Sequence, residues 1–267
     1  MRTHVEFKNL GIDLILNRRA VEFDALGGGI YYYALIICLG FILAWLYISR
    51  EEKKYSKSDD LINLVLIALP AAVVSARLYY VIFSFNDYKD DLSEIFKVWN
   101  GGLAIYGGVI GAAATVFIYC RVKKLSILHY LDLLAMGLLI GQSVGRWGNF
   151  VNGEAHGALV SDSYLLGMTV NGEGPYHPTF LYESVLCALG FLVIFLISKR
   201  IKTEGFKSSA YLIWYGAARF FIEGLRTDSL YIPGTGIRVS QALSAAMFLT
   251  GVIIMARFVR KKKIQLT

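Results

Sequence analysis

Seven long apolar runs constrain this chain more than any other feature of its sequence. They cover approximately residues 30–48, 61–83, 103–120, 127–145, 179–198, 209–225 and 239–256. A helix needs roughly 20 mostly apolar residues to cross a bilayer, and its backbone groups must be hydrogen-bonded internally. Only 18% of the 267 residues are charged, whereas about 25% is usual in a soluble domain. The sequence therefore predicts an all-α integral membrane protein, a single transmembrane domain over residues 1–267, with seven transmembrane helices and a small extracytoplasmic cap.

Basic residues outside the runs are divided unequally between the two sides of the predicted membrane. One side carries sixteen: Arg50, Lys53, Lys54, Lys57, Arg121, Lys123, Lys124, Lys199, Arg200, Lys202, Lys207, Arg257, Arg260, Lys261, Lys262 and Lys263. The other carries nine: Arg2, Lys8, Arg18, Arg19, Lys89, Lys97, Arg146, Arg226 and Arg238. Because cytoplasmic loops carry the excess of Lys and Arg, the N-terminus is predicted outside and the C-terminus in the cytoplasm. The net charge of +7 is then mostly a cytoplasmic rim suited to anionic lipids, and no nucleic-acid partner is expected.

Three segments are candidates for the cap. Residues 1–29 lack the compact apolar core and small-residue cleavage site of a signal peptide, and are predicted to be an arm on the membrane surface or a disordered tail. The loop 146–178 has turn signals at Asn152-Gly153 and Asn171-Gly172, and residues 168–170 are predicted to be half of a small hairpin. This loop, the 85–100 loop and the arm together are expected to form the cap.

The three cysteines, Cys38, Cys120 and Cys187, lie inside or at the edge of apolar runs. Buried free cysteine behaves as a small hydrophobe, and no pair or histidine cluster has the spacing of a zinc site. We therefore expect no disulfide, no metal site and no cysteine nucleophile.

Ionisable residues inside the apolar runs are the first indication of function, because they are costly at membrane depth. They are Arg77, Asp132, Glu183, Arg219 and Glu223. In the sixth run, helical steps place Tyr215, Arg219, Glu223 and Arg226 within about 80° of arc. Such a stripe is either a structural Arg–Glu pair with Arg226 reaching the interface, or a cationic track for a lipid phosphate.

The fourth run contains a serine in a glycine-rich setting, Gly141-Gln142-Ser143-Val144-Gly145. This matches the G-x-S-x-G nucleophile elbow, which requires a turn from a strand into a helix. Gly137, Gly141 and Gly145 instead recur every four residues, as in helices that pack closely. We therefore interpret the glycines as packing residues and Ser143 as no nucleophile.

Directly after this run, residues 145–157 read G-R-W-G-N-F-V-N-G-E-A-H-G. This stretch closely resembles the signature of bacterial prolipoprotein diacylglyceryl transferases. Residues 99–108, 177–183 and 215–226 resemble further segments of that family in order and spacing. The resemblance runs essentially from end to end.

The resemblance implies seven transmembrane helices, an outer N-terminus and residence in the bacterial cytoplasmic membrane. It implies transfer of the sn-1,2-diacylglyceryl group of phosphatidylglycerol to the lipobox cysteine of preprolipoprotein signal peptides. A thioether forms and glycerol phosphate leaves. The implied partners are these two substrates and the lipid bilayer, without a cofactor.

The same resemblance suggests roles for individual residues. Arg146 and Arg219 are expected to stabilise charge on the leaving phosphate, while Asn149 and Glu154 orient the head group or Glu154 holds an arginine. The substrate-binding candidates are Arg146, Asn149, Asn152, Glu154, Gly157, Tyr215, Glu223 and Arg226. Many family members carry histidine where this chain has Tyr106, so the base that accepts the thiol proton is Tyr106, His156 or Glu154.

Two other functions fit the charged spans. A membrane transporter with a charged intramembrane pathway is one, although no repeat relates two halves of the chain. A lipid head-group transferase that uses Mg²⁺ is the other, but such sites need clustered aspartates and the spans hold only Asp132.

Overall fold

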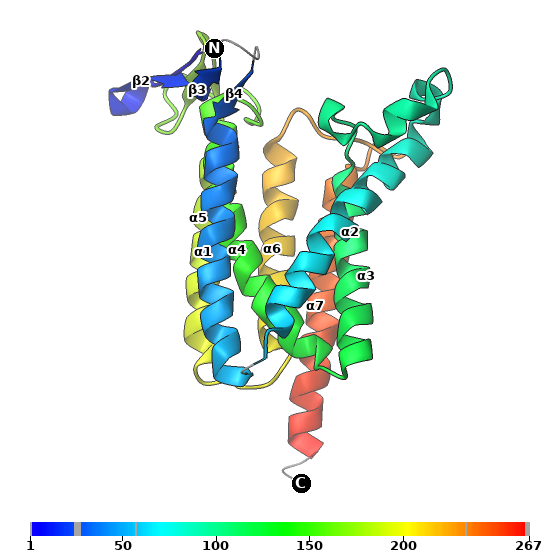
Figure 1. Cartoon of the computed structure of the whole chain (residues 1–267). Coiled ribbons are helices and arrows are strands. Elements are labelled where there is room, and N and C mark those ends of the chain that lie inside the picture. The colour runs from blue at the N-terminus through cyan, green and yellow to red at the C-terminus, as the bar shows by residue number, and fades with distance from the viewer. Residues whose placement is uncertain (1, 24–27, 57, 233, 265–267) are drawn as a thin grey trace. The chain divides into compact units, whose positions relative to one another are not determined.

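Helices dominate the computed structural model, which describes residues 2–23, 28–56, 58–232 and 234–264 (Figure 1). The long helices are α1 (Tyr32–Tyr55), α2 (Asp60–Phe83), α3 (Ile105–Lys123), α4 (Ile127–Asn152), α5 (Thr179–Ser198), α6 (Phe206–Leu225) and α7 (Val239–Ile264). Each coincides with one of the predicted runs. Within the described residues, six of them, all except α6, are long and apolar enough to cross a membrane. The length and apolar composition of these helices are those of a multi-pass membrane protein.

Helix α6 differs because it carries Arg219 and Glu223 among its apolar residues. A charged side chain in a membrane helix is costly unless it faces the protein interior and is paired. Whether α6 can span the bilayer therefore depends on whether Arg219 and Glu223 have partners inside the protein.

Helix α4 extends farther than the apolar run predicted. It continues to Asn152 and ends at Gly153, whose φ of +66° is the left-handed conformation that glycine favours after a helix. Arg146 and Asn149 therefore lie on the last turns of a helix, not in a loop. Their side chains are held by regular backbone, which positions them more rigidly than a loop would.

The strands correct the prediction of an all-α fold. The first 31 residues contain β1 (Arg2–Phe7), β2 (Ile12–Asn17), β3 (Arg19–Phe23) and β4 (Gly28–Tyr31). The predicted hairpin is confirmed as β5 (Met168–Val170) and β6 (Glu173–Tyr176). A disordered tail is wrong for residues 2–23, because their backbone is paired.

The arm and the 146–178 loop share one sheet, with strand order β2-β1-β5-β6, while β3 and β4 form a separate pair. All pairs are antiparallel, and Val5 faces Val170 in the register. His4 and Asn171 fix this junction, because each backbone N–H of the pair donates to an oxygen of the other residue, at 2.9 and 2.8 Å.

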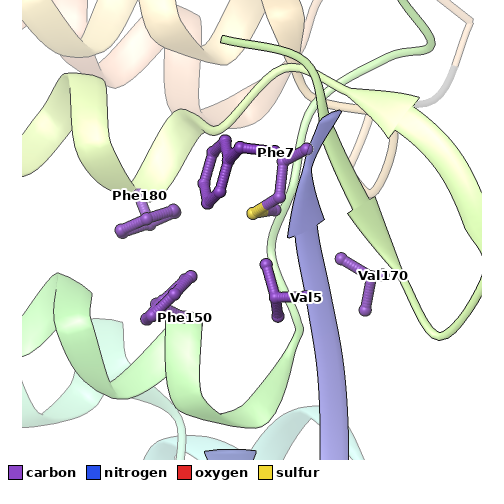
Figure 2. Packing of buried hydrophobic residues seen from close by; sticks show 6 residues of the cluster. Val5, Phe7, Phe150, Val170 and Phe180 are labelled. Atoms are coloured by element: carbon purple, nitrogen blue, oxygen red, sulfur yellow. The ribbon is translucent and has the colours of Figure 1, made fainter. Parts of the chain in front are cut away.

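One face of this sheet is apolar and covers the ends of α4 and α5 (Figure 2). Val5, Phe7 and Val170 pack there against Phe150 and Phe180, whose stacked rings have centroids 4.6 Å apart. Burial of such side chains contributes roughly 1.5–3 kcal/mol each. The packing fixes the position of the chain that follows α4, and with it the residues of the signature.

The chain consists of two compact units, described separately here. Residues 1–48 and 131–267 form the first unit, and residues 49–130 form the second. In the first unit, α4, α5 and α6 share a core that includes Met136, Leu139, Cys187 and Tyr211. In the second, α2 lies against α3, and the 3₁₀ turns η3 (Phe85–Asp87), η4 (Leu92–Phe96) and η5 (Val98–Asn100) join them.

Buried Arg77 of α2 organises that connection. Its guanidinium donates to the carbonyl oxygens of Glu94, Ile95, Gly101 and Gly102 at 2.5–2.9 Å, and lies 4.9 Å from the ring centre of Tyr88. An intramembrane arginine satisfied by backbone carbonyls has a structural role. It fixes the segment that leads into α3 and Tyr106.

Close packing of α3 against α2 yields a stability prediction for two adjacent glycines. A Cβ on Gly107 would lie 2.4 Å from Ser75 O and from Tyr79 Cβ, whereas one on Gly108 would lie 3.6 Å from its nearest neighbour. Alanine improves helix propensity by about 1 kcal/mol at either site, but overpacking costs about 1–3 kcal/mol. We expect Gly107→Ala to lower the unfolding temperature of the purified protein. Gly108→Ala is the matched control and should leave that temperature unchanged or raise it; equal behaviour of the two would contradict the packing.

Candidate functional site

Glu183, near the start of α5, is the centre of the polar site. Arg146 Nη2 donates to its Oε1 at 2.5 Å, and Arg219 Nη1 donates to its Oε2 at 3.2 Å. Tyr215 adds a hydrogen bond to Oε1 at 3.1 Å. One carboxylate therefore joins three helices, α4, α5 and α6, and separates two guanidinium groups.

A second carboxylate completes the charge balance. Arg219 Nη2 lies 2.5 Å from Oε2 of Glu223, one helical turn farther along α6. The side chains of Glu183 and Glu223 are each 2% exposed, so both charges are removed from water. Two arginines and two glutamates give no net charge, which is the condition under which buried ions are tolerated.

The pairing of Arg219 with Glu223 is the contact predicted by the structural interpretation of the stripe on α6. This interpretation is incomplete, because Arg219 also contacts Glu183 on α5. The polar face of α6 is turned toward α4 and α5. That arrangement satisfies its charges inside the protein, as a helix crossing a membrane requires.

The amides of the signature extend the network outward from Arg146. Arg146 Nη1 donates to Asn149 Oδ1 at 3.2 Å, and the Nδ2 groups of Asn149 and Asn152 both donate to Glu154 Oε1 at 3.1 Å. Among the described residues, Glu154 is thus held by two amides. The arginine contact that the sequence suggested for Glu154 is made by Glu183 instead.

Gly157 allows the loop after α4 to approach the end of α6. Its N–H donates to His177 O at 2.9 Å, the next N–H donates to Leu225 O at 2.7 Å, and the residue forms an isolated bridge with Arg226. A Cβ here would lie 2.7 Å from His177 Cβ and 2.9 Å from Leu225 O. Glycine is therefore required by close backbone packing at this position.

Arg226 departs from the predicted stripe. Helix α6 ends at Leu225, and Arg226 is extended, with φ −82° and ψ 148°. Its guanidinium donates to both carboxylate oxygens of Asp228, at 2.9 and 2.6 Å. These hydrogen bonds lower the pKa of Asp228 below its usual value. Arg226 thus belongs to an ion pair beside the network rather than to the face of α6.

Two candidate bases other than Glu154 were predicted, Tyr106 and His156. Tyr106 is on the first turn of α3, in the second unit. The ring of His156 stacks on Tyr176 with centroids 4.0 Å apart, and its Nδ1 lies 3.3 Å from Gly157 O. Because a carbonyl only accepts, this contact requires Nδ1 to be the donor.

Sequence reasoning singled out Glu183 as an ionisable residue in an apolar run but gave it no place in the site. Its role depends on contacts with two other helices, which spacing along one chain does not reveal. The only indication in the sequence was that a glutamate is costly at membrane depth, so that it needs partners inside the protein. Within the described residues, no group of three or more His, Cys, Asp or Glu side chains is placed to hold a metal ion.

Chemically, the network is a set of hydrogen-bond donors that are fixed in position by carboxylates with little exposure to solvent. Each guanidinium has five N–H donors, and those of Arg146 and Arg219 are held in orientation by carboxylates and an amide. Fixed guanidinium groups stabilise developing negative charge, above all on phosphate oxygens.

Comparison with known proteins gives consistent results. The sequence model of the family described as prolipoprotein diacylglyceryl transferase matches residues 21–257. A phosphatidylglycerol–prolipoprotein diacylglyceryl transferase of Streptococcus uberis is 43% identical over 244 residues, 88% of this chain and 93% of that protein. Proteins of the same name from Enterococcus faecalis and Streptococcus pyogenes are each 44% identical, over 88% of this chain and 88% and 93% of theirs.

Proposed function

Because this chain belongs to the prolipoprotein diacylglyceryl transferase family, we propose that it transfers the diacylglyceryl group of phosphatidylglycerol to a prolipoprotein. The acceptor is the lipobox cysteine of the preprolipoprotein signal peptide. The enzyme is a membrane-bound transferase of lipoprotein biosynthesis. The transporter alternative gains no support from the relatives.

The reaction exchanges one bond for another. The cysteine thiol loses its proton to a base, and the thiolate attacks the glyceryl carbon that carries the phosphate. The new S–C bond forms a thioether, the C–O bond breaks, and glycerol phosphate leaves with the electron pair. Negative charge therefore grows on the phosphate during the step.

The observation that carries the proposal is the continuous network from Glu154 to Glu223. It contains seven of the candidate residues: Arg146, Asn149, Asn152, Glu154, Tyr215, Arg219 and Glu223. Arg146 and Arg219 stabilise the leaving phosphate through their guanidinium N–H groups. Asn149 and Glu154 orient the glycerol head group, and Gly157 and Arg226 border the same site.

The experiment that tests this function needs only the purified protein. Incubation in detergent with phosphatidylglycerol and a lipobox peptide should add a diacylglyceryl group to the peptide, detected by mass. No ion gradient is present, so a transporter would give no product. Chelation with EDTA should leave the rate unchanged, whereas loss of activity on chelation would indicate the Mg²⁺-dependent alternative.

Tyr106 is proposed as the group that accepts or directs the thiol proton. A tyrosine without assistance is a poor base at neutral pH, so this role requires an activating cation. We expect Tyr106→Phe to lower the turnover about 10²-fold or more while the protein folds normally, the scale of lost acid–base catalysis. If Tyr106→Phe keeps most activity and His156→Ala loses it, the proton goes to the signature segment instead.

We further propose seven transmembrane helices in the bacterial cytoplasmic membrane, with the N-terminus outside and the four-stranded sheet as part of an extracytoplasmic cap. The excess of basic residues on the opposite side supports this orientation. A cysteine at exposed Ser163 should react with a wall-permeant but membrane-impermeant thiol reagent in intact cells. The unmodified chain is the control. Reaction only after permeabilisation would reverse the orientation and place the site on the cytoplasmic side.

A further inference from the structure

The serine of the glycine-rich motif in α4 makes a specific interhelical contact. Ser143 Oγ donates to the backbone oxygen of Ser184 on α5 at 2.9 Å. Ser184 Oγ donates in return to the backbone oxygen of Ser143 at 2.8 Å. Two hydroxyl groups thus bind α4 and α5 reciprocally, each through a backbone carbonyl of the other helix.

Trp147 adds a third hydrogen bond to the same point. Its indole Nε1 donates to Ser184 Oγ at 3.1 Å, and it lies one helical turn after Ser143, on the same face of α4. The Trp147 ring also packs edge-on against Phe150 and Phe180, at 5.8 and 5.6 Å between centroids. This set of contacts, from Ser143, Trp147 and Ser184, is called the serine clamp below.

The serine clamp is next to the charged network along both helices. Ser184 directly follows Glu183 on α5, and Trp147 directly follows Arg146 on α4. Backbone carbonyls cannot move independently of their helix, so the clamp fixes both the rotation and the axial position of α4 against α5. A slip of one residue would shift a helix by 1.5 Å, enough to break the 2.5 Å contact between Arg146 and Glu183.

We propose that Ser143, Ser184 and the indole N–H of Trp147 are positioning residues, which hold Glu183 between the two arginines in the geometry that transfer requires. The serine in the G-x-S-x-G pattern thus acts through hydrogen bonds and not as a nucleophile. The inference rests on the proposed function of Arg146 and Arg219, since it is their placement that the clamp controls.

The test begins with the double variant Ser143→Ala with Ser184→Ala. A misplacement of about 1 Å costs up to about 10²-fold in rate, so we expect kcat to fall about 10- to 100-fold, with the KM for phosphatidylglycerol changed less than about threefold. Ser143→Thr keeps the donor and should retain kcat within about threefold. Ser244→Ala is the matched control, because buried Ser244 donates only within α7.

A coupling measurement separates positioning from general stability. In an Arg146→Lys background the contact that the clamp aligns is already altered, so the same double change should reduce kcat less than about threefold further. Interacting residues give such non-additive effects, whereas independent ones add. A full 10- to 100-fold further loss in that background, or an unchanged kcat in the wild-type background, would overturn the proposal.

A distance measurement decides the clamp without any assay of transfer. Spin labels at exposed Leu138 on α4 and Leu189 on α5, with exposed Cys38 changed to serine, report the separation of the helices. The distribution should broaden or shift in the double variant but not in Ser244→Ala; an unchanged distribution overturns the clamp. If the wild-type chain transfers no diacylglyceryl group, the proposed function fails, and this measurement alone still decides the clamp. Should the double variant not be recovered, Trp147→Phe replaces it, since it removes the indole donor and keeps an aromatic ring at the same position.

Discussion

Replacing Arg146 or Arg219 with lysine should reduce diacylglyceryl transfer by about 10²- to 10³-fold, the effect of losing one transition-state donor. Each guanidinium engages two partners through different nitrogens: Arg146 contacts Asn149 and Glu183, and Arg219 contacts Glu183 and Glu223. Lysine keeps the positive charge but has a single nitrogen, which cannot reproduce the planar fork. The measurement is the initial rate of peptide modification at saturating lipid.

The control for these variants is Arg121→Lys at the end of α3, where the guanidinium lies over the ring of Phe117 at 5.2 Å. It should transfer at the wild-type rate. All three variants should be recovered from membranes at similar levels, because lysine retains the positive charge at each position. A different outcome is informative for Arg219: if Arg219→Leu with Glu223→Leu is active, Arg219 serves only to neutralise Glu223 and has no role at the phosphate.

The second large effect is expected for Glu183→Gln, which should lower transfer about 10²-fold and also destabilise the protein. The amide offers one oxygen to two arginines and turns an NH₂ donor toward one of them. Arg219 would keep Glu223 as its partner, whereas Arg146 would lose the carboxylate that it contacts. Removal of one partner from a buried ion pair costs about 3–5 kcal/mol, and misplaced donors lose the alignment that catalysis needs.

This prediction has two readouts, the rate of transfer and the thermal unfolding temperature in detergent. Exposed Glu173 on β6 is the matched position, and Glu173→Gln should change neither. A Glu183→Gln protein with wild-type activity would mean that the arginines need no carboxylate between them. The central role given to Glu183 would then be wrong.

The helices could be predicted from sequence because a bilayer makes their signal local. An apolar run of about 20 residues specifies a helix whatever the rest of the chain does, and all seven runs are helical. The end of α4 was placed too early, since Arg146, Asn149 and Asn152 interrupt the apolar pattern without interrupting the helix. A polar residue ends a hydrophobic run, but it does not end a helix whose polar face has partners.

The sheet and the central role of Glu183 could not be predicted from the sequence, for a different reason. Strands β1 and β2 are neighbours in the sequence and pair with each other. Strand β1 also pairs with β5, which is distant in the sequence, and no residue pattern in β1 or β5 indicates this pairing. Glu183 likewise acquires its role from Arg146 and Arg219 on other helices. What the sequence did identify were the residues whose presence in an apolar run required an explanation, and that set contains Glu183, Arg219 and Glu223.

The shared sheet also orders events during synthesis. Strand β1 is made before β5, and the contact between His4 and Asn171 joins residues 167 positions apart. At a translation rate of roughly 5–20 residues per second, β1 exists for roughly 10–30 s before β5 emerges. A hairpin of β1 and β2 alone is marginally stable in water, so this first segment stays unfinished until four helices have been made. The signature residues between α4 and β5 therefore reach their final positions only when β1 pairs with β5, a strand that is made much later.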